Sequence, residues 1–225
     1  MAQGISEILT FAIGVAISPV PIISVILMLF SSRAKVNGPM FLLGWVVALA
    51  VVSGVAYVLA DAGSTSTSTA AADTVSWTQI VFGVLFLLLA GRSWRSRPAP
   101  GTEAEMPKWM AGIDAFAPGK ALGFGLLLAG VNPKNLLLAA GAGSALALIG
   151  PSTTEAVVSL AVFVLIASLT IAGPVVFYLL GGERAKTQLN SVKGWLAVHN
   201  DAVMMVLFLV FGVNLIAKGI PPLTR

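Results

Sequence analysis

The 225-residue sequence contains no cysteine, one histidine and few charged residues. The absence of cysteine excludes disulfide bridges, thiol redox relays and cysteine-ligated metals, but it does not indicate a cellular compartment. Charged residues make up only 10% of the chain, whereas a soluble domain carries about 25% to cover its surface. Residues 1–9 contain no Lys or Arg and so lack the basic region of a cleavable signal peptide. The first apolar segment is therefore expected to remain in the protein.

Apolar residues are correspondingly abundant, at 57% of the chain, and the mean hydropathy is +0.96. A helix that crosses the hydrocarbon core of a bilayer needs about 20 predominantly apolar residues. We predict an all-α, polytopic membrane protein with six transmembrane helices. The predicted spans are Ile8–Phe30, Met40–Ala60, Thr78–Gly91, Ala121–Leu148, Ala156–Leu180 and Ala202–Ala217.

Basic residues are distributed unevenly among the loops that join these spans. The two loops over residues 61–77 and 150–155 contain none. Because basic loops stay in the cytoplasm, the pattern predicts that both termini lie outside. The net charge of +4 then reflects topology, and no nucleic-acid partner is expected. Ten of the thirteen Lys and Arg residues lie in the alternate loops: Arg33, Lys35, Arg92, Arg95, Arg97, Lys108, Lys120, Arg184, Lys186 and Lys193.

A proline motif recurs in the first and fourth spans, each of which opens one half of the chain. Residues 17–23 read Ile-Ser-Pro-Val-Pro-Ile-Ile, and residues 131–137 read Val-Asn-Pro-Lys-Asn-Leu-Leu. With three spans per half, the second half enters the membrane in the opposite orientation, as in many secondary transporters. We predict two inverted three-helix repeats, over residues 1–91 and 121–225. A cytoplasmic linker over residues 92–120 joins them.

Each motif predicts a broken helix. Proline inside a helix removes an amide donor and clashes with the preceding turn, at a cost of about 3 kcal/mol or more. It suits the first helical position, with Ser or Asn before it as the N-cap. A second half-helix is therefore expected to start at each motif near mid-membrane. The two N-termini would approach one another and present partial positive charge and free amide donors.

Lys134 adds a full positive charge at the second break. A lysine at the centre of a span costs about 2.5–3.5 kcal/mol, so it needs a partner or a water-filled cavity. No predicted span contains Asp or Glu. We expect an anionic substrate group as the partner; the alternative is that Lys134 reaches the cytoplasmic head groups. The predicted substrate-binding residues are Ser18, Pro19, Pro21, Asn132, Pro133, Lys134 and Asn135.

Other polar features are weaker candidates for function. A single histidine, His199, is expected to be structural or a helix cap. No cluster suits a metal, a cofactor or acid–base chemistry, so no enzymatic activity is expected. Residues 107–116 of the linker predict either a short interfacial helix or a plain connection. Five polar residues inside spans are expected to bond a neighbouring helix: Ser24, Ser53, Ser168, Thr170 and Asn214.

Three segments together resemble a known family. They are the proline motif of the first span, residues 37–45 (Asn-Gly-Pro-Met-Phe-Leu-Leu-Gly-Trp) and residues 131–138 around Asn-Pro-Lys. The chain is similar over nearly its whole length to the LysE-type exporter superfamily, in particular to its actinobacterial sulfolipid- and peptidoglycolipid-addressing branch. The resemblance implies a plasma-membrane protein that helps envelope glycolipids reach the surface. Amino-acid exporters usually carry Pro-Gly-Pro where this chain has Pro19-Val20-Pro21, which argues against simple amino-acid export.

Three functions follow as hypotheses. The leading one is a transporter or translocation accessory for cell-envelope lipids or glycolipids with an anionic or polar head group. The second is an exporter of small solutes such as amino acids or organic anions. The third is a non-transporting scaffold for envelope biosynthesis. The expected partners are membrane lipids and a glycolipid or small anionic substrate, with a homodimer or envelope-biosynthesis proteins left open.

Overall fold

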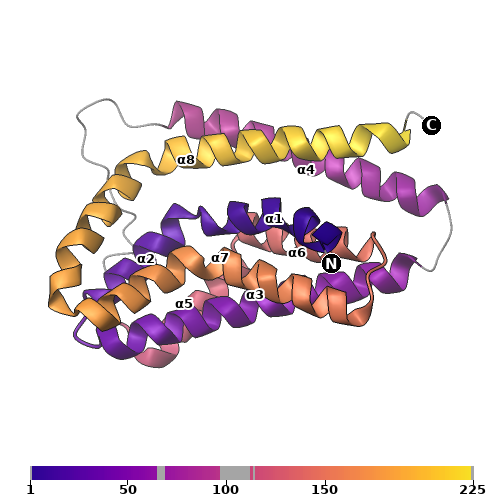
Figure 1. Ribbon diagram of the computed structural model, residues 1–225. Helices are drawn as coiled ribbons and strands as arrows, with labels where there is room; N and C mark the ends of the chain where they lie inside the picture. The colour runs from indigo at the N-terminus through magenta and orange to yellow at the C-terminus, as the bar shows by residue number, and fades with distance from the viewer. Residues whose placement is uncertain (1, 65–68, 97–111, 114, 224–225) are drawn as a thin grey trace. The chain divides into compact units, whose positions relative to one another are not determined.

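The computed structural model describes residues 2–64, 69–96, 112–113 and 115–223. Over these residues the regular structure is helical, without a β-strand, which confirms the predicted all-α class. Figure 1 shows the helices in chain order. They are α1 (Ala2–Ala16), α2 (Pro19–Leu29), α3 (Ala34–Ser64), α4 (Thr69–Arg95), α5 (Pro118–Gly130), α6 (Pro133–Ala147), α7 (Thr153–Gly181) and α8 (Glu183–Leu223).

Several of these helices suit a membrane. Among the described residues, Ala34–Ala62, Thr153–Gly181 and Glu183–Ala217 are each long and apolar enough to cross one. Two bent pairs of shorter helices raise the number to five if each pair is one span. The predicted membrane-protein class is therefore confirmed. The third predicted span, Thr78–Gly91, lies within α4, and the total of six spans stays a prediction.

Both predicted helix breaks are present. The axes of α1 and α2 differ by 54°, and those of α5 and α6 differ by 65°. In each pair the second helix starts at the proline of the motif, Pro19 or Pro133. The local chemistry of proline therefore decides where the first and fourth predicted spans are interrupted.

The chain divides into two compact units. One comprises residues 1–64 and 105–197, and the other residues 65–104 and 198–225. The second unit thus contains α4 and the last part of α8, which hold the third predicted span of each half. The predicted division into residues 1–91, 92–120 and 121–225 follows the repeat along the chain. Units defined by packing do not test a division defined by a repeat, so the division stays a prediction.

Within the first unit, each long helix packs on a broken pair from the other half of the chain. α3 contacts both α5 and α6, and α7 contacts both α1 and α2 (Figure 1). α1 also contacts α6, α2 contacts α5, and α3 contacts α7. The two halves thus make matching contacts when α1, α2 and α3 are taken to correspond to α5, α6 and α7. For example, the contact of α3 with α5 corresponds to that of α7 with α1.

Glycines bring α3 against α5 and α6 backbone to backbone. A Cβ atom at Gly125 of α5 would collide with the carbonyl oxygen of Phe41 in α3. One at Gly143 of α6 would collide with the carbonyl oxygen of Ser53, also in α3. Small residues allow such close approach where lipid supplies no hydrophobic force between helices. α3 therefore holds both arms of the second broken pair at its backbone.

α7 meets the first broken pair through side chains instead. A Cβ atom at Gly4 of α1 would lie 2.7 Å from the hydroxyl oxygen of Ser159 in α7. An added Cβ atom at Gly38 of α3 would lie 2.6 Å from the side chain of Leu29 in α2 and 3.5 Å from that of Val175 in α7. At these glycines the nearest atoms belong to side chains, whereas at Gly125 and Gly143 they belong to the backbone.

The second unit has a glycine crossing of its own. An added Cβ at Gly83 of α4 would lie 2.9 Å from the carbonyl oxygen of Gly212 in α8, and the reverse distance is also 2.9 Å. The rings of Phe86 and Phe208 pack beside this crossing with centroids 5.5 Å apart. The close approach of α4 and α8 therefore depends on two residues without side chains.

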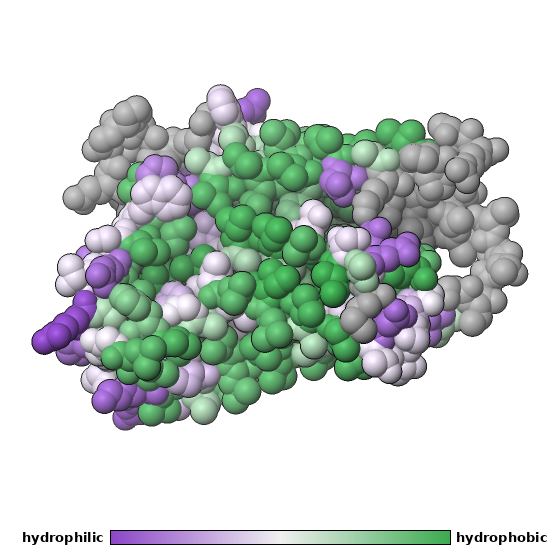
Figure 2. Space-filling view, viewed as in Figure 1, coloured by the Kyte–Doolittle hydropathy of each residue, from purple (hydrophilic) through white to green (hydrophobic). Residues whose placement is uncertain are grey.

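Many large apolar side chains of the first unit are exposed on its surface. Val58 of α3 and Leu165 of α7 are more than half exposed, while Trp45 and Phe163 are completely buried. Figure 2 shows green, apolar side chains over the middle stretches of α3 and α7, with polar residues toward the helix ends. Such a surface is typical of a helix bundle whose solvent is lipid.

Most of the linker segment 107–116 lies outside the described residues. Of its described part, Ile113 is completely buried. The ring of Phe116 meets that of Phe124 edge to face at 5.5 Å, and its carbonyl oxygen accepts a 2.8 Å hydrogen bond from Asn37 Nδ2. Ile113 by its burial and Phe116 by these contacts attach the linker to the first unit. Whether residues 107–116 form an interfacial helix stays a prediction.

Candidate functional site at the two helix breaks

The first break consists of Ile17 and Ser18, between α1 and α2. Ser18 occupies the N-cap position of α2, and Pro19 starts the helix. The Ser18 side chain makes no cap bond to its own helix. Its expected role as a side-chain cap is therefore wrong, because its hydroxyl group is engaged with residues of the second break.

The second break consists of Val131 and Asn132, between α5 and α6. Here the cap is made: Asn132 Oδ1 accepts a 3.1 Å hydrogen bond from the backbone N–H of Lys134. Pro133 takes the first helical position of α6. Asn132 thus satisfies one of the amide donors that every helix N-terminus leaves without an intrahelical partner.

Lys134 joins the two breaks. Its side-chain amine donates a 3.0 Å hydrogen bond to the carbonyl oxygen of Ile17 and a 2.7 Å bond to the hydroxyl oxygen of Ser18. Only 7% of the residue is exposed. The alternative in which Lys134 extends to the cytoplasmic head groups is therefore wrong. The expectation that only a substrate would pair with this amine also needs correction, because the protein occupies two of its three donors.

Asn135 completes a buried chain of hydrogen bonds. Ser18 Oγ donates to Asn135 Oδ1 over 3.0 Å, and Asn135 Nδ2 donates to the carbonyl oxygen of Leu128 in α5 over 2.8 Å. Ser18 and Asn135 are almost fully buried. The chain therefore runs from α1 through Lys134, Ser18 and Asn135 to the last turns of α5, and it links both broken pairs.

Thr170 of α7 satisfies a further carbonyl of the first break. Its hydroxyl group donates a 2.6 Å hydrogen bond to the carbonyl oxygen of Ala16, the last residue of α1. Lys134 and Thr170 together satisfy two successive carbonyl groups at the end of α1. In a lipid environment such groups are costly without a partner, so these two bonds stabilise the break.

The site places a basic side chain beside two helix N-termini. The N-termini of α2 and α6 meet here, and helix N-termini carry partial positive charge. The Lys134 amine lies beside them, and its hydrogen-bond partners among the described residues are neutral: the Ile17 carbonyl group and the Ser18 hydroxyl group. The site therefore combines a buried amine with two helix N-termini.

Only some of the predicted substrate-binding residues form the hydrogen-bonded network. Ser18, Lys134 and Asn135 form one hydrogen-bonded network, and Asn132 caps α6 beside it. Pro19 and Pro21 are buried in the first turn of α2, whereas Pro133 is exposed. The prolines therefore position the site, and the polar residues compose it.

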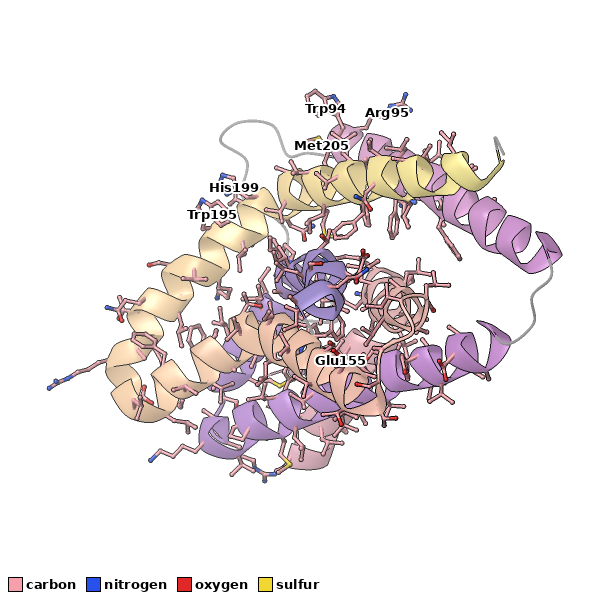
Figure 3. All side chains as sticks on the ribbon, turned by 45° about the vertical axis from the view of Figure 1, so that its right-hand side comes forward. Trp94, Arg95, Glu155, Trp195, His199 and Met205 are labelled. Carbon is pink, nitrogen blue, oxygen red and sulfur yellow. The ribbon has the colours of Figure 1, made fainter. Side chains whose placement is uncertain are left out.

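Other predicted polar residues have different partners from those expected. Thr170 bonds a neighbouring helix, as predicted, but Ser24 and Ser53 bond carbonyl oxygens of their own helices, Val20 at 2.7 Å and Leu49 at 2.8 Å. Ser168 is buried and Asn214 is exposed. His199 lies inside α8 (Figure 3), so it is not a helix cap.

The partner of Lys134, the Ile17 carbonyl group, is missing from the sequence-based prediction. A signal existed, because a proline break in a membrane helix frees carbonyl groups that must find donors. No group of three or more His, Cys, Asp or Glu residues suitable for a metal occurs among the described residues.

A family model described as "Sap, sulfolipid-1-addressing protein" matches residues 8–221 of this chain. This chain belongs to the Sap family. The match includes both helix breaks and every residue of the network, so the site lies within the Sap-family domain. The family's description points to a lipid-related role at a membrane. It confirms the Sap part of the resemblance, while the wider relation to LysE-type exporters stays a prediction. Neither a curated protein nor a solved structure matches the chain.

Proposed function

We propose that this Sap-family chain transports, or helps to translocate, cell-envelope lipids with an anionic or polar head group in the plasma membrane. The observation that carries the proposal is Lys134, a residue that is 7% exposed and whose amine, among the described residues, is bonded to neutral groups at the junction of two helix breaks. Ionisable residues inside a membrane are costly and mark substrate pathways. An anionic head group would supply the negative charge that the hydrogen-bond partners of Lys134 lack.

The architecture we propose is six transmembrane helices in two inverted repeats. The contacts between the two halves map onto themselves when the halves are exchanged, which supports this arrangement. Transporters of this kind bind substrate at the repeat interface, beside discontinuous helices. The position of the basic loops supports an orientation in which both termini lie outside.

The route follows from the surfaces of the first unit. A head group would pass the N-termini of α2 and α6 and meet the third donor of Lys134. The acyl chains would stay in the bilayer, against the apolar outer faces of the helices. This separation would spare the protein the cost of enclosing the acyl chains, because lipid tails are as apolar as leucine side chains.

Lipid profiling of a deletion strain tests the proposal. Cells that lack the gene would be complemented with the native chain, with Lys134→Met or with Lys35→Met, whose lysine lies exposed at the start of α3. We expect the native chain and the Lys35 variant to restore the surface lipids and the Lys134 variant to fail. Lys134→Arg, which keeps the charge, should restore them in part.

Two other results would decide against the proposal. Normal surface lipids in the deletion strain, with accumulation of a small solute, would indicate a solute exporter. Full restoration by Lys134→Met, at a membrane level equal to that of the native chain, would favour the scaffold. Quantifying each variant in isolated membranes separates loss of function from loss of the protein.

A further inference from the structure

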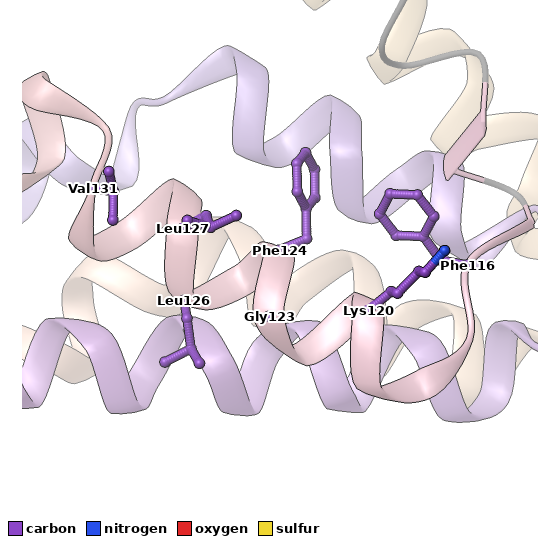
Figure 4. A pocket seen from close by; sticks show the side chains of 7 residues that line it. All are labelled: Phe116, Lys120, Gly123, Phe124, Leu126, Leu127 and Val131. Carbon is purple, nitrogen blue, oxygen red and sulfur yellow. The ribbon is translucent and has the colours of Figure 1, made fainter.

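A groove along α5 takes no part in the site described above. It has a volume of about 540 Å³, and Lys120 and Val131 lie at its two ends (Figure 4). At 1.5 Å per residue this stretch of helix is about 16 Å long, roughly half of a 30 Å hydrocarbon core. The groove therefore has the length that the acyl chain of one leaflet occupies, and it ends at Val131, the first residue of the second helix break.

The lining of the groove is apolar except at one end. The rings of Phe116 and Phe124 meet edge to face near Lys120, and Leu127 continues the apolar lining. Gly123 lies between Lys120 and Leu127, one turn from each. A Cβ atom at Gly123 would meet no atom of the described residues within 4 Å, so among these residues Gly123 leaves open space on the helix surface.

We propose that this groove binds one acyl chain of an anionic phospholipid, with the phosphate group at Lys120. Apolar contact alone does not select a lipid here, because the surrounding tails are equally apolar. Selection therefore depends on the exposed lysine, which lies in the first turn of α5, where the helix dipole also favours negative charge. The site goes beyond the proposed function, since it binds lipid whether or not that lipid is moved.

The expected selectivity is modest and measurable. One lysine near the membrane surface favours an anionic lipid by about 1 kcal/mol, which corresponds to about a fivefold preference. The full-length protein would be placed in nanodiscs that contain equal amounts of phosphatidylglycerol and phosphatidylcholine. A photoreactive benzoylphenylalanine would replace Leu127 in the groove or, as a matched position, Leu165 on the exposed face of α7; their exposed fractions are 52% and 67%.

Mass spectrometry of the cross-linked lipids gives the result. We expect phosphatidylglycerol to exceed phosphatidylcholine about fivefold at position 127 and the two lipids to be equal at position 165. Lys120→Gln should bring the ratio at position 127 to about one, whereas Lys35→Gln should leave it unchanged. Equal ratios at both positions in the native background would identify ordinary boundary lipid and overturn the proposal.

A second pair of variants tests the groove itself. Gly123→Leu should lower the total cross-linking yield at position 127 several-fold by filling the open space. Gly173→Leu in α7, where an added Cβ also meets no atom within 4 Å, should not change it. An unchanged yield with Gly123→Leu would also overturn the proposal. These readouts measure binding, so they are independent of the outcome of lipid profiling with the Lys134 variants.

Discussion

The amine of Lys134 lies 3.0 Å from the carbonyl oxygen of Ile17, the residue directly after α1. One end of this bond belongs to the first turn of α6 and the other to the residue that follows the C-terminus of α1. A cation is stabilised at a helix C-terminus, where the backbone carries partial negative charge. The pair therefore connects the two halves of the chain and makes the charge tolerable without a carboxylate.

Replacing Ser18 by alanine should destabilise the protein by about 1–2 kcal/mol, because Lys134 and Asn135 each lose a buried partner. The measurement is the free energy of unfolding in mixed detergent micelles. Ser24→Ala is the matched control, since the Ser24 hydroxyl only bonds Val20 in its own helix. Equal effects of the two substitutions would show that the network between the breaks contributes no stability of its own.

Replacing Thr170 by valine should cost about 1 kcal/mol, because the shape is kept while the Ala16 carbonyl group loses its donor. Ser168→Ala, two residues earlier, is expected to be neutral or slightly stabilising. The Ser168 hydroxyl group is buried without a hydrogen-bond partner among the described residues. Thermal unfolding in detergent compares the two. A larger loss with Ser168→Ala would contradict the assignment of these hydroxyl groups.

Gly125→Ala should be strongly destabilising, by about 1–3 kcal/mol or more, because its methyl group would collide with the backbone carbonyl of Phe41. Gly123→Ala, two residues earlier in the same helix, meets no described atom within 4 Å and should stabilise the helix by up to about 1 kcal/mol. Both are measured by thermal unfolding and by yield of folded protein. Equal stability of the two variants would refute the backbone contact of α3 with α5.

The absence of native cysteine makes topology directly testable. Single cysteines at Lys35 and Thr154 lie at the start of α3 and in the first turn of α7, both exposed. With a membrane-impermeant maleimide on intact cells, we expect Thr154→Cys to react and Lys35→Cys to react only after lysis. Labelling of both on intact cells would contradict the predicted orientation, and the reverse pattern would invert it.

The positions of the breaks could be predicted because the cause is local. Pro19 and Pro133 each exclude a continuous helix and suit a helix start, whatever surrounds them. The same holds for the side-chain cap of Asn132, which needs only the next two residues. For Lys134 the sequence leaves two positions open, the interior and the cytoplasmic head groups, and the structure decides for the interior.

The partners of these residues could not be predicted, because they depend on how distant segments pack. Lys134 and Ile17 are 117 positions apart, and Thr170 and Ala16 are 154 apart. Sequence shows the donors and shows that breaks free carbonyl groups, but not which donor reaches which carbonyl. The contact of Gly125 with Phe41 is equally a property of the packed helices, since glycine itself only permits close approach.

The backbone contacts of α3 make the second bend a fixed angle. Gly125 of α5 and Gly143 of α6 each lie in backbone contact with α3. The angle between α5 and α6 therefore cannot change without breaking at least one of these contacts. At Gly4 of α1, by contrast, the nearest atom is the hydroxyl oxygen of Ser159 in α7, and a side chain can shift by changing rotamer. If the protein opens and closes, we expect α1 and α2 to move while α5 and α6 stay fixed against α3.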